Sequence, residues 1–187
     1  MLSLRIVILF CMLLGAAVLL WRIAPSPSKL VLTSSVDHFP LVSGYNLNRQ
    51  EFVFPRDFSG KFNLVIVPFQ RYQQMTVDTW IPIAKELEAS FPGLVYYELP
   101  TIYAMPMISR TFLNEGMRAG IPDETARERT ITLYLDKEAF MSGLQIPDEG
   151  DISLFLVDGS GKILWRSRGA YTPEKAAELV TVLQQRP

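Results

Sequence analysis

Hydrophobic positions divide the chain into one short, uninterrupted apolar stretch and a long region of alternating patterns. The stretch from Ile6 to Trp21 carries no charge and is flanked by Arg5 and Arg22. At about 1.5 Å per residue it would span roughly 24 Å as a helix, close to the ~30 Å hydrocarbon core of a bilayer. Residues 1–24 are therefore expected to be an N-terminal transmembrane helix or a secretory signal peptide, and the pattern leaves both open.

The next segment has no regular pattern. Pro25 and Pro27 alternate with serines, which is typical of a stiff polar spacer, and proline, glycine and asparagine interrupt the stretch further along. We assign residues 25–46 to a linker that holds at most an added edge strand.

Beyond residue 46 the periodicity switches repeatedly between strand and helix. It predicts strands at 51–54, 63–69, 94–99, 130–135, 152–157 and 162–167, and helices at 76–91, 105–119, 137–144 and from 173 onward. The glycine-rich Asp158–Gly161 predicts a hairpin turn, and Thr172 followed by Pro173 marks the start of the last helix. A βαβ half followed by a ββα half predicts an α/β fold over residues 47–187, with a central mixed sheet flanked by helices.

Composition narrows the function classes. The chain has 18 basic and 19 acidic residues, and two of the basic ones are the arginines that flank the apolar stretch. The remaining region of about 160 residues suits a single domain and is slightly acidic. Because it contains no basic stripe, we expect no nucleic-acid partner.

Catalytic groups are scarce. The only cysteine, Cys11, lies in the apolar stretch, whereas dithiol exchange needs an attacking thiolate and a second thiol to resolve the mixed disulfide. The only histidine, His38, lies in the linker without neighbours at metal-ligand spacing. The sequence predicts that the protein is not an enzyme and that it has no catalytic residue, metal or cofactor.

The chain resembles the thioredoxin-like superfamily from Leu47 to Gln185. The phrase Asp57-Phe-Ser-Gly-Lys61 precedes a buried strand, as in the peroxiredoxin and cytochrome-maturation branches. Pro82 matches the proline that kinks a helix in that superfamily, and it sets the register. The resemblance implies a thioredoxin-like fold.

The resemblance also implies that the redox site is degenerate. In the register set by the proline, the two cysteine positions fall on Gln74 and Val77, and the cis-proline position falls near Ile152. None of these side chains can carry out the chemistry of the superfamily.

A closer resemblance is to the mitochondrial ATP synthase assembly chaperone family, whose members help the proton-channel subunit a mature and join the rotor ring. The shared positions are Arg129–Tyr134, Phe140, Leu144, Phe155–Asp158, Gly161, Ile163, Trp165, Gly169 and Thr172–Glu174. That family also lacks the dithiol, but it uses organelle targeting sequences where this chain has its own apolar stretch.

These features imply a membrane-anchored, non-catalytic protein that binds a membrane-protein client and assists complex assembly, with ATP synthase as the specific candidate. The short tail before Arg5 places the domain on the periplasmic or an equivalent non-cytoplasmic side. The expected client-binding residues are Arg71, Tyr72, Gln73, Gln74, Met105, Met107 and Trp165.

Two other function classes remain open. Thioether sulfurs suit Cu(I), so Met105 and Met107 allow a periplasmic ligand or copper carrier. A degenerate peroxiredoxin-like redox protein is the other alternative, and it would need a thiol in the folded domain.

Overall fold

The computed structural model describes residues 37–186. Its elements are β1 (Val42–Asn46), β2 (Glu51–Phe54), β3 (Phe62–Val67), the short 3-10 helix η1 (Arg71–Gln73), α2 (Gln74–Ser90), β4 (Leu94–Glu98), β5 (Thr101–Tyr103), α3 (Met107–Gly120), α4 (Glu124–Arg129), β6 (Ile131–Leu135), α5 (Lys137–Leu144), β7 (Ser153–Asp158), β8 (Ile163–Arg168) and α6 (Pro173–Gln184). The predicted anchor lies outside the described residues. None of the helices between residues 37 and 186 is long and apolar enough to cross a bilayer.

The central sheet is mixed, as the sequence predicted. Its strand order is β4-β3-β7-β8, with β3 parallel to β4 and antiparallel to β7, which pairs in turn with β8. Every residue of β3 is buried, in keeping with its continuous apolar sequence. Between β7 and β8 the expected turn is present, and Gly161 has a φ of 93°, which an L side chain rarely adopts.

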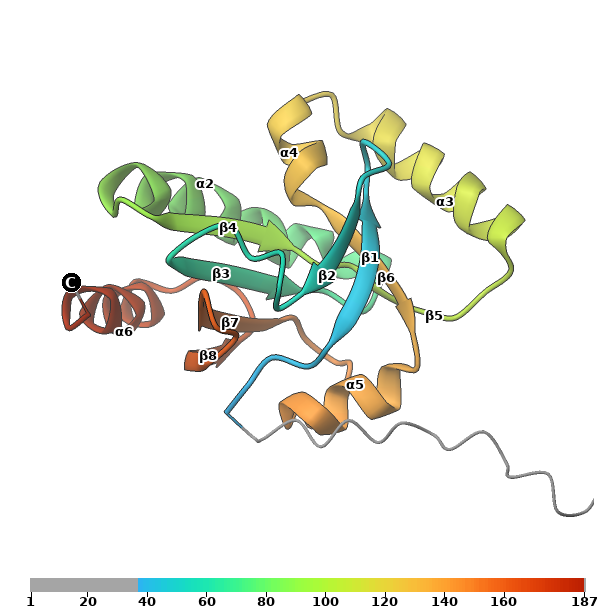
Figure 1. Ribbon diagram of the computed structural model, residues 1–187. Coiled ribbons are helices and arrows are strands. Elements are labelled where there is room, and N and C mark those ends of the chain that lie inside the picture. The colour runs from blue at the N-terminus through green and yellow to red at the C-terminus, as the bar shows by residue number, and fades with distance from the viewer. Residues whose placement is uncertain (1–36, 187) are drawn as a thin grey trace, which may run out of the picture. The chain divides into compact units, whose positions relative to one another are not determined.

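Helices α2 and α6 cover one face of this sheet (Figure 1). One apolar cluster there contains Trp80 of α2, Leu64 of β3, Leu156 of β7, Trp165 of β8 and Leu179 of α6. Thr172 caps α6 by accepting a hydrogen bond from the backbone of Lys175, as expected. This half of the molecule follows the predicted βαβ and ββα pattern.

The other face is covered differently from what the sequence predicted. A second four-stranded sheet, with the order β2-β1-β6-β5, packs against it together with α5. In the view of Figure 1 its strands run steeply across those of the central sheet. Phe54, Leu133 and Phe140 contribute to the core between the two layers. The expected α/β fold with a central mixed sheet and flanking helices is present, but the strand predicted at 130–135 belongs to a second sheet that the sequence did not predict.

The linker assignment is wrong for its last residues. Val42–Asn46 forms β1, an inner strand of the second sheet that pairs with both β2 and β6. Close packing explains why a glycine stands in this strand, since a Cβ on Gly44 would lie 2.5 Å from the carbonyl oxygen of Thr132. The sequence does not predict β1 because the serine, glycine and asparagine of this strand are more typical of loops than of strands.

Candidate functional site

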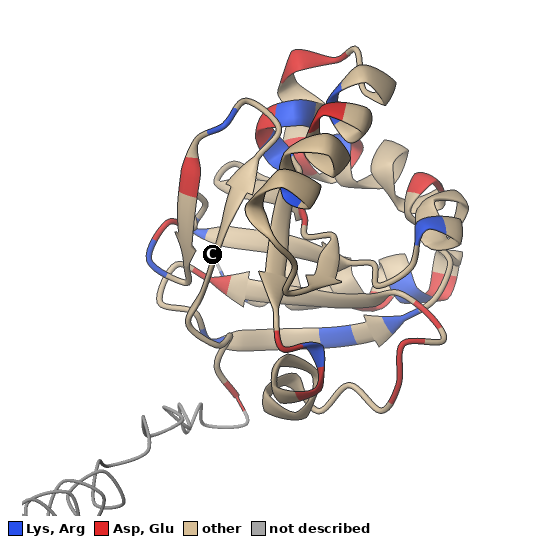
Figure 2. Ribbon diagram, turned by 90° about the vertical axis from the view of Figure 1, so that its right-hand side faces the viewer, with Lys and Arg blue, Asp and Glu red and all other residues tan. Residues whose placement is uncertain are grey.

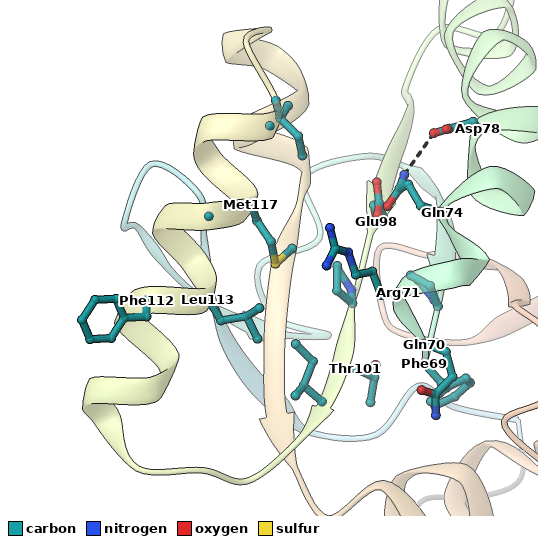
Figure 3. A pocket seen from close by; sticks show the side chains of 16 residues that line it. Phe69, Gln70, Arg71, Gln74, Asp78, Glu98, Thr101, Phe112, Leu113 and Met117 are labelled. Carbon is teal, nitrogen blue, oxygen red and sulfur yellow. Dashed lines mark hydrogen bonds between the residues drawn. The ribbon is translucent and has the colours of Figure 1, made fainter.

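The candidate site is an open pocket of about 790 Å³ between the start of α2 and the side of α3. Its base comes from the carboxyl ends of β3 and β4 and from β5. Figure 3 shows Arg71 and Gln74 on one side and Leu113 and Met117 of α3 on the other. This is the end of the central sheet where the resemblance places the lost redox centre. The volume falls in the range of ligand-binding pockets.

A buried glutamine holds the loop before α2 in place. The Oε1 atom of Gln73 accepts hydrogen bonds from the backbone amides of Phe69, at 2.7 Å, and Gln70, at 3.1 Å. Its Nε2 atom donates to the backbone carbonyl of Glu149 at 2.7 Å. Gln73 thus ties the loop before α2 to the segment that leads into β7.

An ion pair strengthens the same junction. The ammonium group of Lys137, which is almost fully buried, lies 2.6 Å from the carboxylate of Glu149 and also donates to the carbonyl of Phe69 at 3.2 Å. Burial alone would raise the pKa of Glu149, but the hydrogen bond and charge of Lys137, together with hydrogen bonds from Gln70 and Tyr103, lower the pKa. The loop is therefore held rigidly beside the pocket.

Helix α3 is attached to the domain through polar side chains. The hydroxyl of Tyr134 on β6 donates to Asn114 at 2.7 Å, and the guanidinium of Arg110 lies 5.0 Å from the centre of the Tyr134 ring. Glu115 forms an ion pair with Arg49 at 2.8 Å. These contacts place the polar side of α3 against the second sheet.

The apolar side of α3 consequently points away from the core. No residue of α3 is buried, and Met107, Ile108 and Phe112 are 81%, 74% and 78% exposed. In Figure 3 Phe112 points outward, whereas Leu113 and Met117 point toward the pocket. Amphipathic helices ordinarily bury their apolar stripe, so α3 is unusual in leaving these large apolar side chains exposed.

A buried carboxylate lies at the base of the pocket. Glu98, at the end of β4, is only 7% exposed and has no ion-pair partner within residues 37–186. Burial raises its pKa to about 7, the negative charge of Asp78 adds to this effect, and a hydrogen bond from Gln74 opposes it. A perturbed carboxyl in a concave site is typical of functional positions.

The structure brings together some of the predicted client-binding residues. Arg71 and Gln74 line the pocket, and Tyr72 is exposed next to them in the chain. Met107 is the first residue of α3 and Met105 lies two residues before it; neither is among the residues that line the pocket.

Two of the predicted client-binding residues are enclosed in the domain, which corrects their assignment as contacts. Gln73 is 2% exposed because its amide is used within the loop. Trp165 is 9% exposed and its ring packs 6.3 Å from Trp80, between the central sheet and the helices. Both side chains are too deeply buried to contact a client.

The three residues predicted to be degenerate redox positions lie in two different parts of the fold. Gln74 is the first residue of α2, one turn before the fully buried Val77, and Pro82 lies inside the same helix. Ile152 is buried directly before β7, and its carbonyl accepts a hydrogen bond from the backbone of Gly169.

Sequence reasoning missed the buried carboxylate. The signal was present, since Glu98 is the one charged residue within the strand predicted at 94–99. The short helix α4 and strand β5 were also missed. Both are too short to show a clear periodicity. As to metals, residues 37–186 hold no cluster of three or more histidine, cysteine, aspartate or glutamate side chains that could bind one.

The central sheet, its two covering helices and the pocket at the start of α2 define a thioredoxin-like fold. BsSco, a member of the Sco family of cytochrome c oxidase assembly proteins, matches with a TM-score of 0.52 and 12% identity, over 80% of this chain and 95% of that one. A putative electron transport protein from Aquifex aeolicus VF5 matches with a TM-score of 0.55 and 8% identity, over 79% and 95% of the two chains.

A thiol:disulfide interchange protein from Bacteroides sp. aligns with a TM-score of 0.49 and 15% identity, over 78% of this chain and 86% of that chain. No protein-family model matches the chain, and no curated protein sequence matches it either. At these identities the likeness to solved structures establishes the fold alone.

Proposed function

We propose that this protein is a membrane-anchored, non-catalytic thioredoxin-like protein that binds a membrane-protein client and assists assembly of the client's complex. The observation that carries the proposal is the inverted helix α3, which is fastened by Asn114 and Glu115 and presents Ile108 and Phe112 outward. An exposed apolar helix face next to a pocket is suited to binding an apolar segment of another protein.

The missing thiols support a non-catalytic role. Gln74 and Val77 stand where the superfamily has its cysteines, and the only cysteine of the chain, Cys11, belongs to the N-terminal apolar stretch. A carboxamide and an isopropyl group cannot form or break a disulfide. Both positions are therefore consistent with a site that binds a partner without disulfide exchange.

The membrane location and the choice of client rest on the sequence. The stretch from Ile6 to Trp21 would hold the domain at a bilayer, on the periplasmic or an equivalent non-cytoplasmic side. The resemblance of the C-terminal third to the ATP synthase assembly chaperone family makes an ATP synthase subunit the specific candidate. The Sco family offers a further example of this fold among proteins described as assembly proteins.

Site-specific photocrosslinking in intact cells tests the proposal. A photoreactive amino acid is placed at Phe112 on α3, and a control is placed at Glu86 on the exposed side of α2. We expect the α3 probe to capture a subunit of a membrane complex and the α2 probe to capture none. Recovery of no membrane subunit from the α3 probe would reject client binding, and normal ATP synthase levels in a deletion strain would reject the specific client.

A further inference from the structure

The pocket beside α3 has an acidic base. Glu98 from β4 and Asp78 from α2 both line it, and Gln74 donates a hydrogen bond to Asp78 at 3.0 Å. Figure 3 shows these three side chains gathered at one end of the pocket. Enclosing the Glu98 carboxylate without a cation is costly, because a buried charge needs a partner to offset its lost hydration.

The one basic side chain that lines the pocket does not neutralise this base. Among the ion pairs of residues 37–186, none joins Arg71 to Glu98 or Asp78, and Arg71 is exposed. Burial and the charge of Asp78 raise the pKa of Glu98, which is the expected response of a carboxyl group without a cationic partner. A positive group that entered the pocket would supply the missing charge.

Helix α3 forms the opposite wall of the pocket, which is apolar and has open space next to its glycines. Leu113 and Met117 of α3 point into the pocket, and methionine adapts readily to irregular partners (Figure 3). Gly116 and Gly120 lie on the same wall, and a Cβ added to either would meet nothing within 4 Å. The backbone of α3 is therefore open to close approach by another segment.

We propose that the pocket receives a lysine or arginine side chain carried on an apolar segment of the client. The ammonium or guanidinium group would lie at Glu98 and Asp78, and the apolar part of the segment would pack against Leu113 and Met117. This inference rests on the proposed client-binding function and specifies the chemistry of its ligand. Charge complementarity selects this occupant over a purely apolar or an acidic one.

Binding of defined peptides tests the inference. Three fluorescent peptides of alanine, leucine and serine, each as long as α3, differ only in a central arginine, glutamine or glutamate. Their affinity for the full-length protein in nanodiscs of zwitterionic phosphatidylcholine is measured by fluorescence anisotropy, with empty nanodiscs as the blank. We expect the arginine peptide to bind about tenfold more tightly than the glutamine peptide, and the glutamate peptide to bind most weakly.

Two variants assign this preference to the pocket. Glu98→Gln keeps the size of the side chain and one acceptor oxygen and removes its charge, so it is expected to abolish the preference for arginine. Gly116→Leu fills the space beside α3 and is expected to weaken binding of all three peptides. Glu86→Gln on the exposed side of α2 is the matched control and leaves the preference intact. Circular dichroism verifies that each variant is folded.

The outcomes separate this inference from the function on which it rests. Equal binding of the three peptides, no binding of any of them, or an arginine preference that survives Glu98→Gln would overturn the basic-segment inference, even if photocrosslinking at Phe112 still captured a client. Conversely, a preference for arginine that depends on Glu98, together with a failure to capture any membrane subunit in cells, would uphold the pocket chemistry and reject the assembly role.

Discussion

Helices α2 and α3 are both amphipathic, yet the fold uses them in opposite ways. On α2, Val77, Trp80, Ala84 and Leu87 are buried against the central sheet. On α3, no residue is buried, and the helix is held by polar contacts through residues such as Asn114. The difference shows that an apolar stripe predicts a helix reliably but does not reveal whether the stripe faces the core or a partner.

Charge does not account for this difference. Acidic and basic residues are interspersed over the described domain, and both signs occur around α3 and α4 (Figure 2). The two helices differ instead in what lies opposite them. Helix α2 faces the fully buried strand β3, whereas α3 faces Tyr134 of β6 and the turn that carries Arg49. The surface of β3 therefore packs with apolar side chains of α2, whereas Tyr134 and the turn with Arg49 pack with polar side chains of α3.

Truncating one large side chain on each helix tests whether α2 packs through its apolar side and α3 does not. Trp80→Ala removes a fully buried ring that contacts Trp165 and Tyr171 and donates to the carbonyl of Gly169 at 2.9 Å. We expect a loss of about 3–5 kcal/mol in the free energy of unfolding. Phe112→Ala on α3 is expected to change it by no more than about 0.5 kcal/mol.

Urea denaturation of the full-length protein in detergent micelles, followed by circular dichroism, measures both effects. A loss of several kcal/mol for Phe112→Ala would show that α3 packs through its apolar side after all. A small loss for Trp80→Ala would contradict the assignment of the core beneath α2.

The central half of the fold was open to prediction because its signals are local. The continuous apolar strand at 63–69, the glycine turn at Asp158–Gly161 and the capped helix at Thr172 each carry their own pattern. The second sheet was not predictable in the same way. Its inner strand, Val42–Asn46, is defined by pairing with a partner far along the chain rather than by its own residues.

The pH dependence of stability tests the buried carboxyl at the base of the pocket. The pKa of Glu98 is about 7 in the folded protein, against 4.5 as its ordinary value. Between these two pH values the folded state holds more protons than the unfolded state, so stability falls as the pH rises. At about 1.4 kcal/mol per pKa unit, the fall attributable to Glu98 between pH 5 and 8 is roughly 2–3 kcal/mol.

Glu98→Gln should remove this part of the pH dependence, and denaturation at several pH values measures it. Asp78→Asn should reduce this pH dependence only in part. It removes a neighbouring charge that raises the pKa of Glu98 but leaves the burial of Glu98 unchanged. A slope that is identical in the native protein and in Glu98→Gln would show that Glu98 is ionised normally.

A smaller effect is expected at the loop that precedes α2. Gln73→Ala leaves the backbone amide of Phe69 and the carbonyl of Glu149 without their partner, which should cost about 2 kcal/mol in the free energy of unfolding. Gln74→Ala is the matched control, since this neighbouring glutamine is exposed and should change the free energy by about 0.5 kcal/mol or less. Equal effects in the two variants would contradict the structural role of Gln73.

The candidate site was only partly predictable, for reasons that these two glutamines illustrate. The sequence places Gln73 and Gln74 in the same polar loop, and nothing local distinguishes the buried amide from the exposed one. The distinction arises from Glu149, which lies far along the chain and meets only Gln73 through its backbone. Glu98 is similar, because its role depends on α3 forming the opposite wall of the pocket.

The smallest expected effect concerns the glycine in the middle of α3. A Cβ on Gly116 would meet nothing within 4 Å, so Gly116→Ala should stabilise the helix by about 0.5–1 kcal/mol through its better helix propensity. The same methyl group narrows the approach to the apolar wall, and the arginine peptide should bind several-fold more weakly. Stability and binding would then change in opposite directions, as expected if α3 serves a partner rather than its own core. A variant that binds the peptide as tightly as the native protein would place Gly116 outside the contact surface, and a destabilised variant would contradict the open space around Gly116.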